Sequence, residues 1–161
     1  MTPSDLLITA LLAIAPISEL RGAIPYAIIK KADPVFVYFY CVFFNCLIAP
    51  FFYIFISTLH KLLLKIDWYS GLFEKFILKA RDKIKKGVDK YGYIGLLIFI
   101  AVPLPFTGAY TGTAGAWVLG LEKRKTLLII TAGLAISGLI VSLIIYFGVE
   151  AFSFFTKKVS A

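Results

Sequence analysis

The chain is poor in the residues from which metal centres and nucleophilic active sites are built. It has one histidine, His60, and two cysteines, Cys41 and Cys46, five positions apart in one apolar stretch. On a helix this spacing points the two thiols to different faces, so no disulfide between them is expected, and one histidine cannot complete a metal cluster. No nucleophile–base pair is evident either. The sequence therefore argues against an enzyme and predicts no catalytic residue, no metal and no cofactor.

Amide and acidic side chains are also scarce. There is no glutamine, Asn45 is the one asparagine, and nine acidic residues stand against seventeen Lys and Arg. A low content of asparagine and glutamine is typical of heat-tolerant proteins. Hydrophobic residues make up 60% of the chain, with a mean hydropathy of +0.90, which indicates an integral membrane protein. In such a protein, basic residues record topology and contact with anionic lipids, so the net charge of +8 does not predict nucleic-acid binding.

Two charge-free stretches, 35–59 and 126–149, are long enough to cross a bilayer. Two other apolar stretches are interrupted, one over 16–25 and one over 103–113. The loop-shaping residues of these breaks are Pro16, Gly22, Pro25, Pro103, Pro105, Gly108 and Gly112. Their arms, such as 6–17 and 22–29, are too short to span a core that needs about 20 residues. We therefore expect two re-entrant helical hairpins; the alternative is two kinked helices that cross fully, which would give four spans with both termini inside.

Between the halves, 61–90 has apolar residues every three or four positions and many lysines elsewhere. This pattern predicts an amphipathic helix lying in the headgroup plane, or alternatively a helix that packs on the cytoplasmic face of the protein. The expected fold is thus an all-α integral membrane protein with an inverted repeat of hairpin plus transmembrane helix. It forms a single domain, 1–161, with repeat 1 over about 4–60, the interfacial helix over about 61–91 and repeat 2 over about 92–156.

Basic residues also predict the orientation. Twelve lie in 61–90 and the 123–125 turn, whereas four lie at 30–31 and 157–158 on the other side. The positive-inside rule then places the middle of the chain in the cytoplasm and both termini outside, in a multi-pass protein of the cell membrane. Two spans and two hairpins are too few to enclose a substrate path, so the expected partners are membrane lipids and a second copy of the chain.

Ionisable residues at membrane depth are the strongest functional signal, because they are costly and rarely persist without a partner or a task. Glu19 is a candidate proton carrier, and Arg21 a candidate grip for an anionic headgroup. The alternative is a salt bridge that pins the hairpin tip. In the second break, freed carbonyls and threonine hydroxyls could bind an ion or substrate, or the segment is simply a tight turn. The candidate substrate- or ion-binding residues are Glu19, Arg21, Asn45, Thr107, Tyr110 and Thr111; Asn45 has the alternative role of interhelical hydrogen bonding.

Three strings carry a resemblance: Ser-Glu-Leu-Arg-Gly-Ala-Ile-Pro over 18–25, Pro-Leu-Pro-Phe-Thr-Gly over 103–108, and Thr-Ala-Gly over 113–115. With them, nearly the whole chain resembles the small multidrug export protein family. That family is similar in layout to the DedA/VTT membrane proteins, which have two opposed re-entrant hairpins and include lipid transporters, scramblases and polyprenyl-phosphate carriers. In the DedA/VTT proteins, an acidic residue in the first hairpin and arginines near the second hairpin are held to be essential. Glu19 matches the acidic residue. The second break of this chain holds no arginine, because Arg21 lies in the first hairpin and Arg124 lies after the second.

These observations together predict a transporter of an anionic-headgroup lipid, polyprenyl-phosphate-like, or of another amphipathic small molecule, coupled to protons or cations. The alternatives are a small multidrug exporter, a passive ion channel with the Thr/Gly loop as its filter, and an assembly protein without transport.

Overall fold

The computed structural model describes residues 1–63, 67–104 and 107–159, with side chains over 1–58, 71–104 and 107–148. Every element in the described residues is a helix, which confirms the all-α fold class. The helices are α1 (Pro3–Ile14), α2 (Glu19–Ile29), α3 (Pro34–Leu63), α4 (Asp67–Tyr91), α5 (Tyr93–Ala101), α6 (Ala109–Val118) and α7 (Lys123–Val159).

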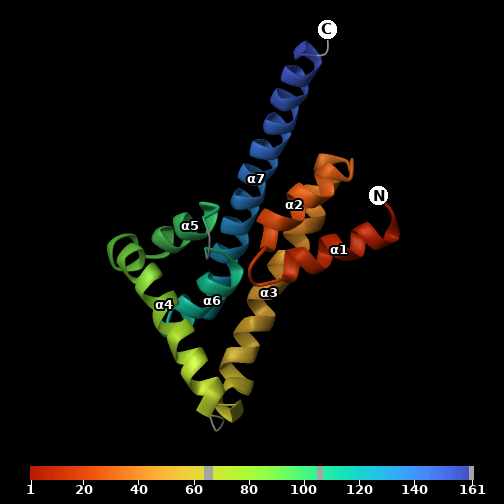
Figure 1. The fold of residues 1–161 in the computed structure, drawn as a ribbon. Helices are drawn as coiled ribbons and strands as arrows, with labels where there is room; N and C mark the ends of the chain where they lie inside the picture. The colour runs from red at the N-terminus through yellow and green to blue at the C-terminus, as the bar shows by residue number, and fades with distance from the viewer. Residues whose placement is uncertain (64–66, 105–106, 160–161) are drawn as a thin grey trace.

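The two longest helices, α3 and α7, run antiparallel and side by side through the middle of the molecule (Figure 1). Pro34–Thr58 and Lys123–Gly148 are long and apolar enough to cross a membrane, which agrees with the predicted spans. The small residues of α7 let its neighbours approach closely. Gly133 lies against the Ile100 side chain of α5, and Gly138 against Val42 of α3. The small residues of α7 therefore pack against other helices of the same chain.

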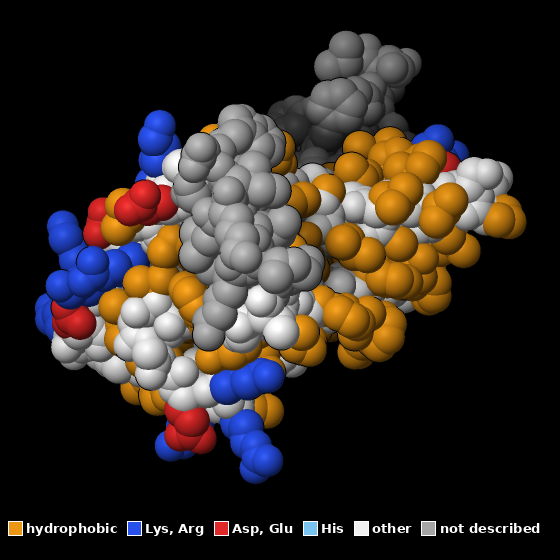
Figure 2. Space-filling model, turned by 90° about the horizontal axis from the view of Figure 1, so that it is seen from below, with side chains coloured by type: hydrophobic (Ala, Val, Ile, Leu, Met, Phe, Trp, Pro, Cys, Tyr) orange, Lys and Arg blue, Asp and Glu red, His pale blue; other side chains and the backbone are white. Residues whose placement is uncertain are grey.

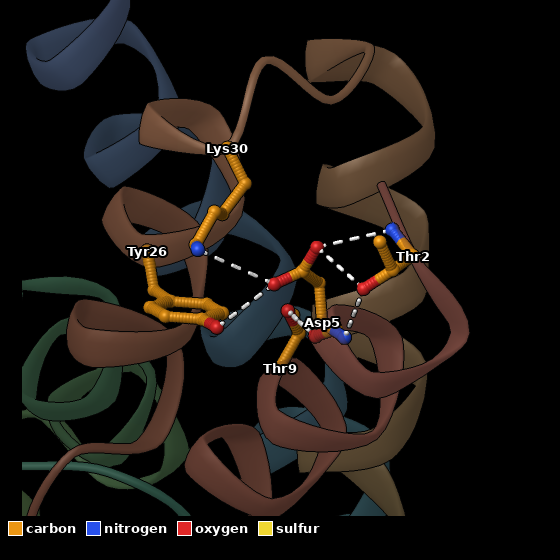
Figure 3. A network of polar contacts seen from close by, with 5 residues as sticks. All are labelled: Thr2, Asp5, Thr9, Tyr26 and Lys30. Carbon is orange, nitrogen blue, oxygen red and sulfur yellow. Dashed lines mark hydrogen bonds and ion pairs between the residues drawn. The ribbon is translucent and has the colours of Figure 1, made fainter.

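Helices α1 and α2 form a hairpin whose two ends lie together. Asp5, near the start of α1, is 3.5 Å from the Lys30 ammonium at the end of α2 and accepts a hydrogen bond from the Tyr26 hydroxyl at 3.2 Å (Figure 3). The turn between the helices, 15–18, is shorter than predicted. Pro16 lies in it, whereas Gly22 and Pro25, which were also predicted as loop-shaping residues, lie inside α2. Proline is tolerated there at the cost of one helical hydrogen bond to the residue four positions earlier. An added Cβ at Gly22 would meet the Ser18 side chain of the turn.

Helices α5 and α6 form the second hairpin. Its ends are joined by the Tyr93 hydroxyl, which accepts a hydrogen bond from the Glu122 N–H at 3.0 Å. Pro103 lies in the connecting segment, and Pro105 lies outside the described residues. The expected loop over 103–113 is wrong in its second half, because α6 begins at Ala109 and includes Thr111, Gly112 and Thr113. Threonine and glycine are weak helix formers, but buried packing of these small residues overrides propensity.

Helix α4 packs on the second hairpin. Its Ile77, Ala80 and Ile84 are buried, and Gly115 of α6 lies against the Ile84 side chain and the Ala80 carbonyl. These three buried residues pack against α6, in agreement with the alternative interpretation of 61–90, a helix that packs on the protein. The helix begins at Asp67, later than predicted, because α3 continues to Leu63.

Candidate functional site at the tips of the two hairpins

Glu19 links the first hairpin to the start of α6. It is the first residue of α2, is only 7% exposed and has a φ of 46°. Its carboxylate lies beside Gly108, and the backbone N–H groups of Ala109 and Tyr110, the first two residues of α6, favour its negative charge. The N-terminal end of a helix carries unpaired N–H groups and a partial positive charge, which together favour an anion. Glu19 therefore occupies an anion-binding position that the second hairpin provides.

Gly108 makes this approach possible. A Cβ at position 108 would coincide with the Glu19 carboxylate, so any residue larger than glycine would displace that carboxylate. Gly108 was predicted as a loop-shaping residue in a segment whose glycines allow close approach. Its missing side chain leaves the space that the Glu19 carboxylate occupies.

Arg21 reaches the same loop by a separate contact. Its Nη2 atom donates to the Thr107 hydroxyl at 2.8 Å and also to the Thr107 carbonyl oxygen. The Thr107 hydroxyl in turn accepts from the Leu104 N–H at 3.1 Å and lies 2.8 Å from the Val102 carbonyl oxygen. Thr107 thus orders the tip of the second hairpin and presents it to Arg21.

Glu19 and Arg21 also act on each other. Their opposite charges interact electrostatically, and this interaction favours the charged form of both side chains. Among the described side chains, ion pairs within 4 Å join Lys30 to Asp5 and Lys125 to Glu122. A Glu19–Arg21 salt bridge alone does not describe this site, because each side chain also contacts the second hairpin.

The C-terminal end of α1 lies at the same junction, and side chains satisfy its last carbonyl groups. The donors are the Ser18 hydroxyl to Leu12, the Asn45 amide to Ala13 at 2.7 Å, and the Tyr110 hydroxyl to Ile14 at 2.7 Å. Terminal carbonyls have no partner within their own helix, and lipid offers none. Asn45 and Tyr110 therefore connect α3 and α6 to the tip of the first hairpin.

Asn45 has bonding capacity left. It is fully buried, and its Oδ1 atom has no hydrogen-bond partner in the described part of the chain. A buried acceptor without a partner is costly, so this oxygen is available to a ligand or water at the junction.

The structure thus brings five of the six candidate residues together: Glu19, Arg21, Asn45, Thr107 and Tyr110. Thr111 faces elsewhere, toward a pocket beside α4. Gly112 serves packing, because its missing side chain admits Ile100. The role of Ser18 was missed: it precedes α2, yet its hydroxyl makes no capping bond there and donates instead to the Leu12 carbonyl of α1.

An apolar groove begins at this junction. It has a volume of about 390 Å³, and Ile14 and Tyr110, which hydrogen-bond to each other, line one part of it. The rest is lined by apolar residues of α3, most of them aromatic, including Phe44, Phe51 and Phe52. The site therefore combines a polar junction with an adjoining apolar surface, the arrangement an amphipathic ligand requires.

These features define a helical membrane protein with two short hairpins that meet at their tips beside two long apolar helices. The family model described as "Putative small multi-drug export protein" matches residues 19–140, most of the chain, and the chain belongs to that family. A search of the curated proteins and a search of the solved structures give no match.

Proposed function

We propose that this protein is a small membrane transporter for an amphipathic molecule with an anionic headgroup, and that the junction of the hairpin tips is its binding site. One observation carries the proposal: an acidic and a basic side chain of one hairpin bind the backbone of the other at a mostly buried junction. Broken helices whose ends meet in this way form the substrate sites of many transporters.

The hairpin geometry supports re-entrant insertion. The arms are 9 to 12 residues long, which at 1.5 Å per residue gives about 14 to 18 Å, roughly half the hydrocarbon core. In each hairpin the start of the first arm contacts the end of the second arm, through Asp5 and Lys30 in one and Tyr93 and Glu122 in the other. Both ends of a hairpin therefore lie on the same side of the membrane. A kinked helix that crossed fully would separate these ends. Hairpins entering from opposite faces and meeting at mid-depth give the inverted repeat.

Glu19 then acts as the coupling residue. As a carboxylate it fills the N-terminus of α6. When a proton binds to one carboxylate oxygen, the negative charge at that helix end is lost, and an anionic headgroup can replace it beside Arg21. The apolar part of the ligand lies in the groove lined by Tyr110 and the aromatic residues of α3. A lipid phosphate, polyprenyl-phosphate-like, has this chemistry.

The family description favours a drug-like cargo as a second candidate, since the apolar groove would also accept one. The charge of Arg21 favours anions over the cations typical of such drugs. A channel whose filter is the Thr/Gly segment is less well supported, because Thr111 and Thr113 lie inside α6, where helical hydrogen bonds occupy the backbone. Two long helices enclose little space, so we propose that a second copy completes the path.

Flux into proteoliposomes tests the proposal. We expect saturable uptake of a fluorescent lipid phosphate that depends on a pH gradient and is absent from protein-free vesicles. Faster uptake of a cationic dye than of the lipid phosphate would favour drug export. An ohmic current without saturable flux would refute the transporter.

A further inference from the structure

A second pocket lies between α4 and α6, away from the hairpin junction. Its volume is about 720 Å³, and Thr111 contributes to its α6 side. On α4 it is lined by Leu72, Lys75, Phe76 and Lys79 and by their neighbours Ala80 and Lys83. These positions are spaced by three and four residues, so they form one continuous stripe on the helix.

We propose that this pocket binds the phosphate group of an anionic amphiphile through Lys75 and Lys79, with the start of its hydrocarbon chain against Leu72 and Phe76. The proposal rests on the proposed function for the origin of the ligand, but not for the binding itself. Leu72 is 52% exposed and Phe76 37% exposed, unlike the buried stripe of α4. An apolar strip bordered by ammonium groups matches a molecule with an anionic head and an apolar tail.

Charge complementarity determines the class of ligand. Three lysines and one acidic residue, Asp82, line the pocket, so its local charge is positive. In Figure 2 the Lys and Arg side chains gather on the side where α4 lies in Figure 1, next to hydrophobic surface. Basic residues at a membrane surface each attract anionic lipid by about 1 kcal/mol. A neutral or zwitterionic amphiphile would gain little from this arrangement.

The pocket also leads toward the hairpin junction. Lys83 lines both this pocket and a neighbouring one of about 410 Å³, whose other lining residues include Val102, Leu104 and Thr107. Thr107 is the residue held by Arg21. The α4 pocket is therefore positioned as an entry or exit site for the cargo of the junction.

The test is a fluorescence-anisotropy titration of the full chain in neutral maltoside detergent with a labelled short-chain phosphatidate. We expect saturable binding, about a tenfold or greater loss of affinity in Lys75→Gln/Lys79→Gln, and a clear loss in Phe76→Ser. The matched control is Lys85→Gln/Lys86→Gln, which removes the same charge from exposed positions of α4 that line neither pocket. This control is expected to change affinity less than about twofold.

Three results would overturn the proposal: equal losses in the two double variants, equal binding of labelled phosphatidylcholine, or complete competition by inorganic phosphate at the same concentration. Glu19→Gln separates this inference from the proposed function. It is expected to abolish flux and leave phosphatidate binding intact. In the unmutated protein, absent flux with normal binding refutes only the proposed function, and absent binding with normal flux refutes only this inference.

Discussion

The Arg21 guanidinium donates to the hydroxyl oxygen of Thr107, 86 residues further along the chain, at 2.8 Å. This contact joins the tips of the two hairpins, and Glu19 makes the companion contact to the start of α6. Because lipid supplies no hydrogen bonds, these contacts both close the structure and place polar groups where a substrate could meet them.

Glu19→Gln is expected to abolish transport and leave the fold intact. The amide oxygen can still accept a hydrogen bond at the N-terminus of α6, but the side chain can carry neither a proton nor a negative charge. Flux in proteoliposomes and the thermal midpoint in detergent measure the two effects. A stable variant with wild-type flux would refute the coupling role.

Glu19→Ala serves as the matched comparison. It removes the cap of α6 altogether, which costs about 0.5–2 kcal/mol, and it leaves Arg21 without its neighbouring carboxylate. We expect a lower thermal midpoint than in Glu19→Gln. Equal midpoints for the two variants would show that the carboxylate does not act as a helix cap.

Gly108→Ala is expected to destabilise the protein and reduce transport. The new methyl group would occupy the position of the Glu19 carboxylate and force it away from α6. The control is Gly71→Ala, where an added Cβ meets nothing within 4 Å. Since alanine favours a helix by about 1 kcal/mol over glycine, this control should be neutral or slightly stabilising. Similar thermal midpoints for the two variants would contradict the close approach.

Tyr110→Phe is expected to destabilise the protein by about 0.5–1.5 kcal/mol, because the last carbonyl of α1, at Ile14, loses its hydrogen-bond donor. Ring packing against Phe52 is kept. Denaturant unfolding measures the change. Thr58→Ala, which removes a hydroxyl bonded within its own helix, is a control of the same chemical kind and should have little effect. An unchanged unfolding free energy for Tyr110→Phe would show that this hydrogen bond does not stabilise the protein.

The base of the first hairpin is expected to resist acid. Hydrogen bonds from the backbone N–H and the hydroxyl of Thr2 lower the pKa of Asp5 to about 2. A carboxyl whose pKa falls on folding stabilises the fold above its unfolded pKa, and this contribution is lost as the pH falls from that value to about 2. In Thr2→Ala the folded pKa of Asp5 should be higher, so the contribution should be smaller and its loss complete at a higher pH. Thermal midpoints across the acid range check this, and superimposable curves for the two proteins would contradict it.

Topology can be tested by cysteine labelling in a background without Cys41 and Cys46. Thr2→Cys is expected to react with an impermeant maleimide from outside intact cells, and Lys86→Cys only after the membrane is opened. Both positions are exposed. The expectation follows from the basic residues of α4 and the 123–125 turn. Labelling of Lys86→Cys, and not of Thr2→Cys, in intact cells would invert the orientation.

The order of elements could be predicted from the sequence, because long charge-free runs and proline-containing breaks are local signals. The spans in α3 and α7 and the existence of two helical hairpins followed from them. The breaks themselves were predicted too long. Gly22, Pro25, Thr111 and Gly112 are weak helix formers, but all four lie inside helices that pack on their neighbours, and Thr111 and Gly112 are themselves buried.

The charges of the candidate site were also evident in the sequence, since an acidic and a basic residue inside an apolar segment require an explanation. The partners were not. Three relationships depend on how hairpins 86 residues apart approach each other. Glu19 lies at the start of α6, Arg21 binds Thr107, and Asn45 and Tyr110 bind the last carbonyl groups of α1. Periodicity records which residues avoid water, and therefore determined the helices and their apolar faces. Which unpaired backbone group meets which side chain is decided only when the helices pack, because hydrogen bonds require contact in space rather than nearness in sequence.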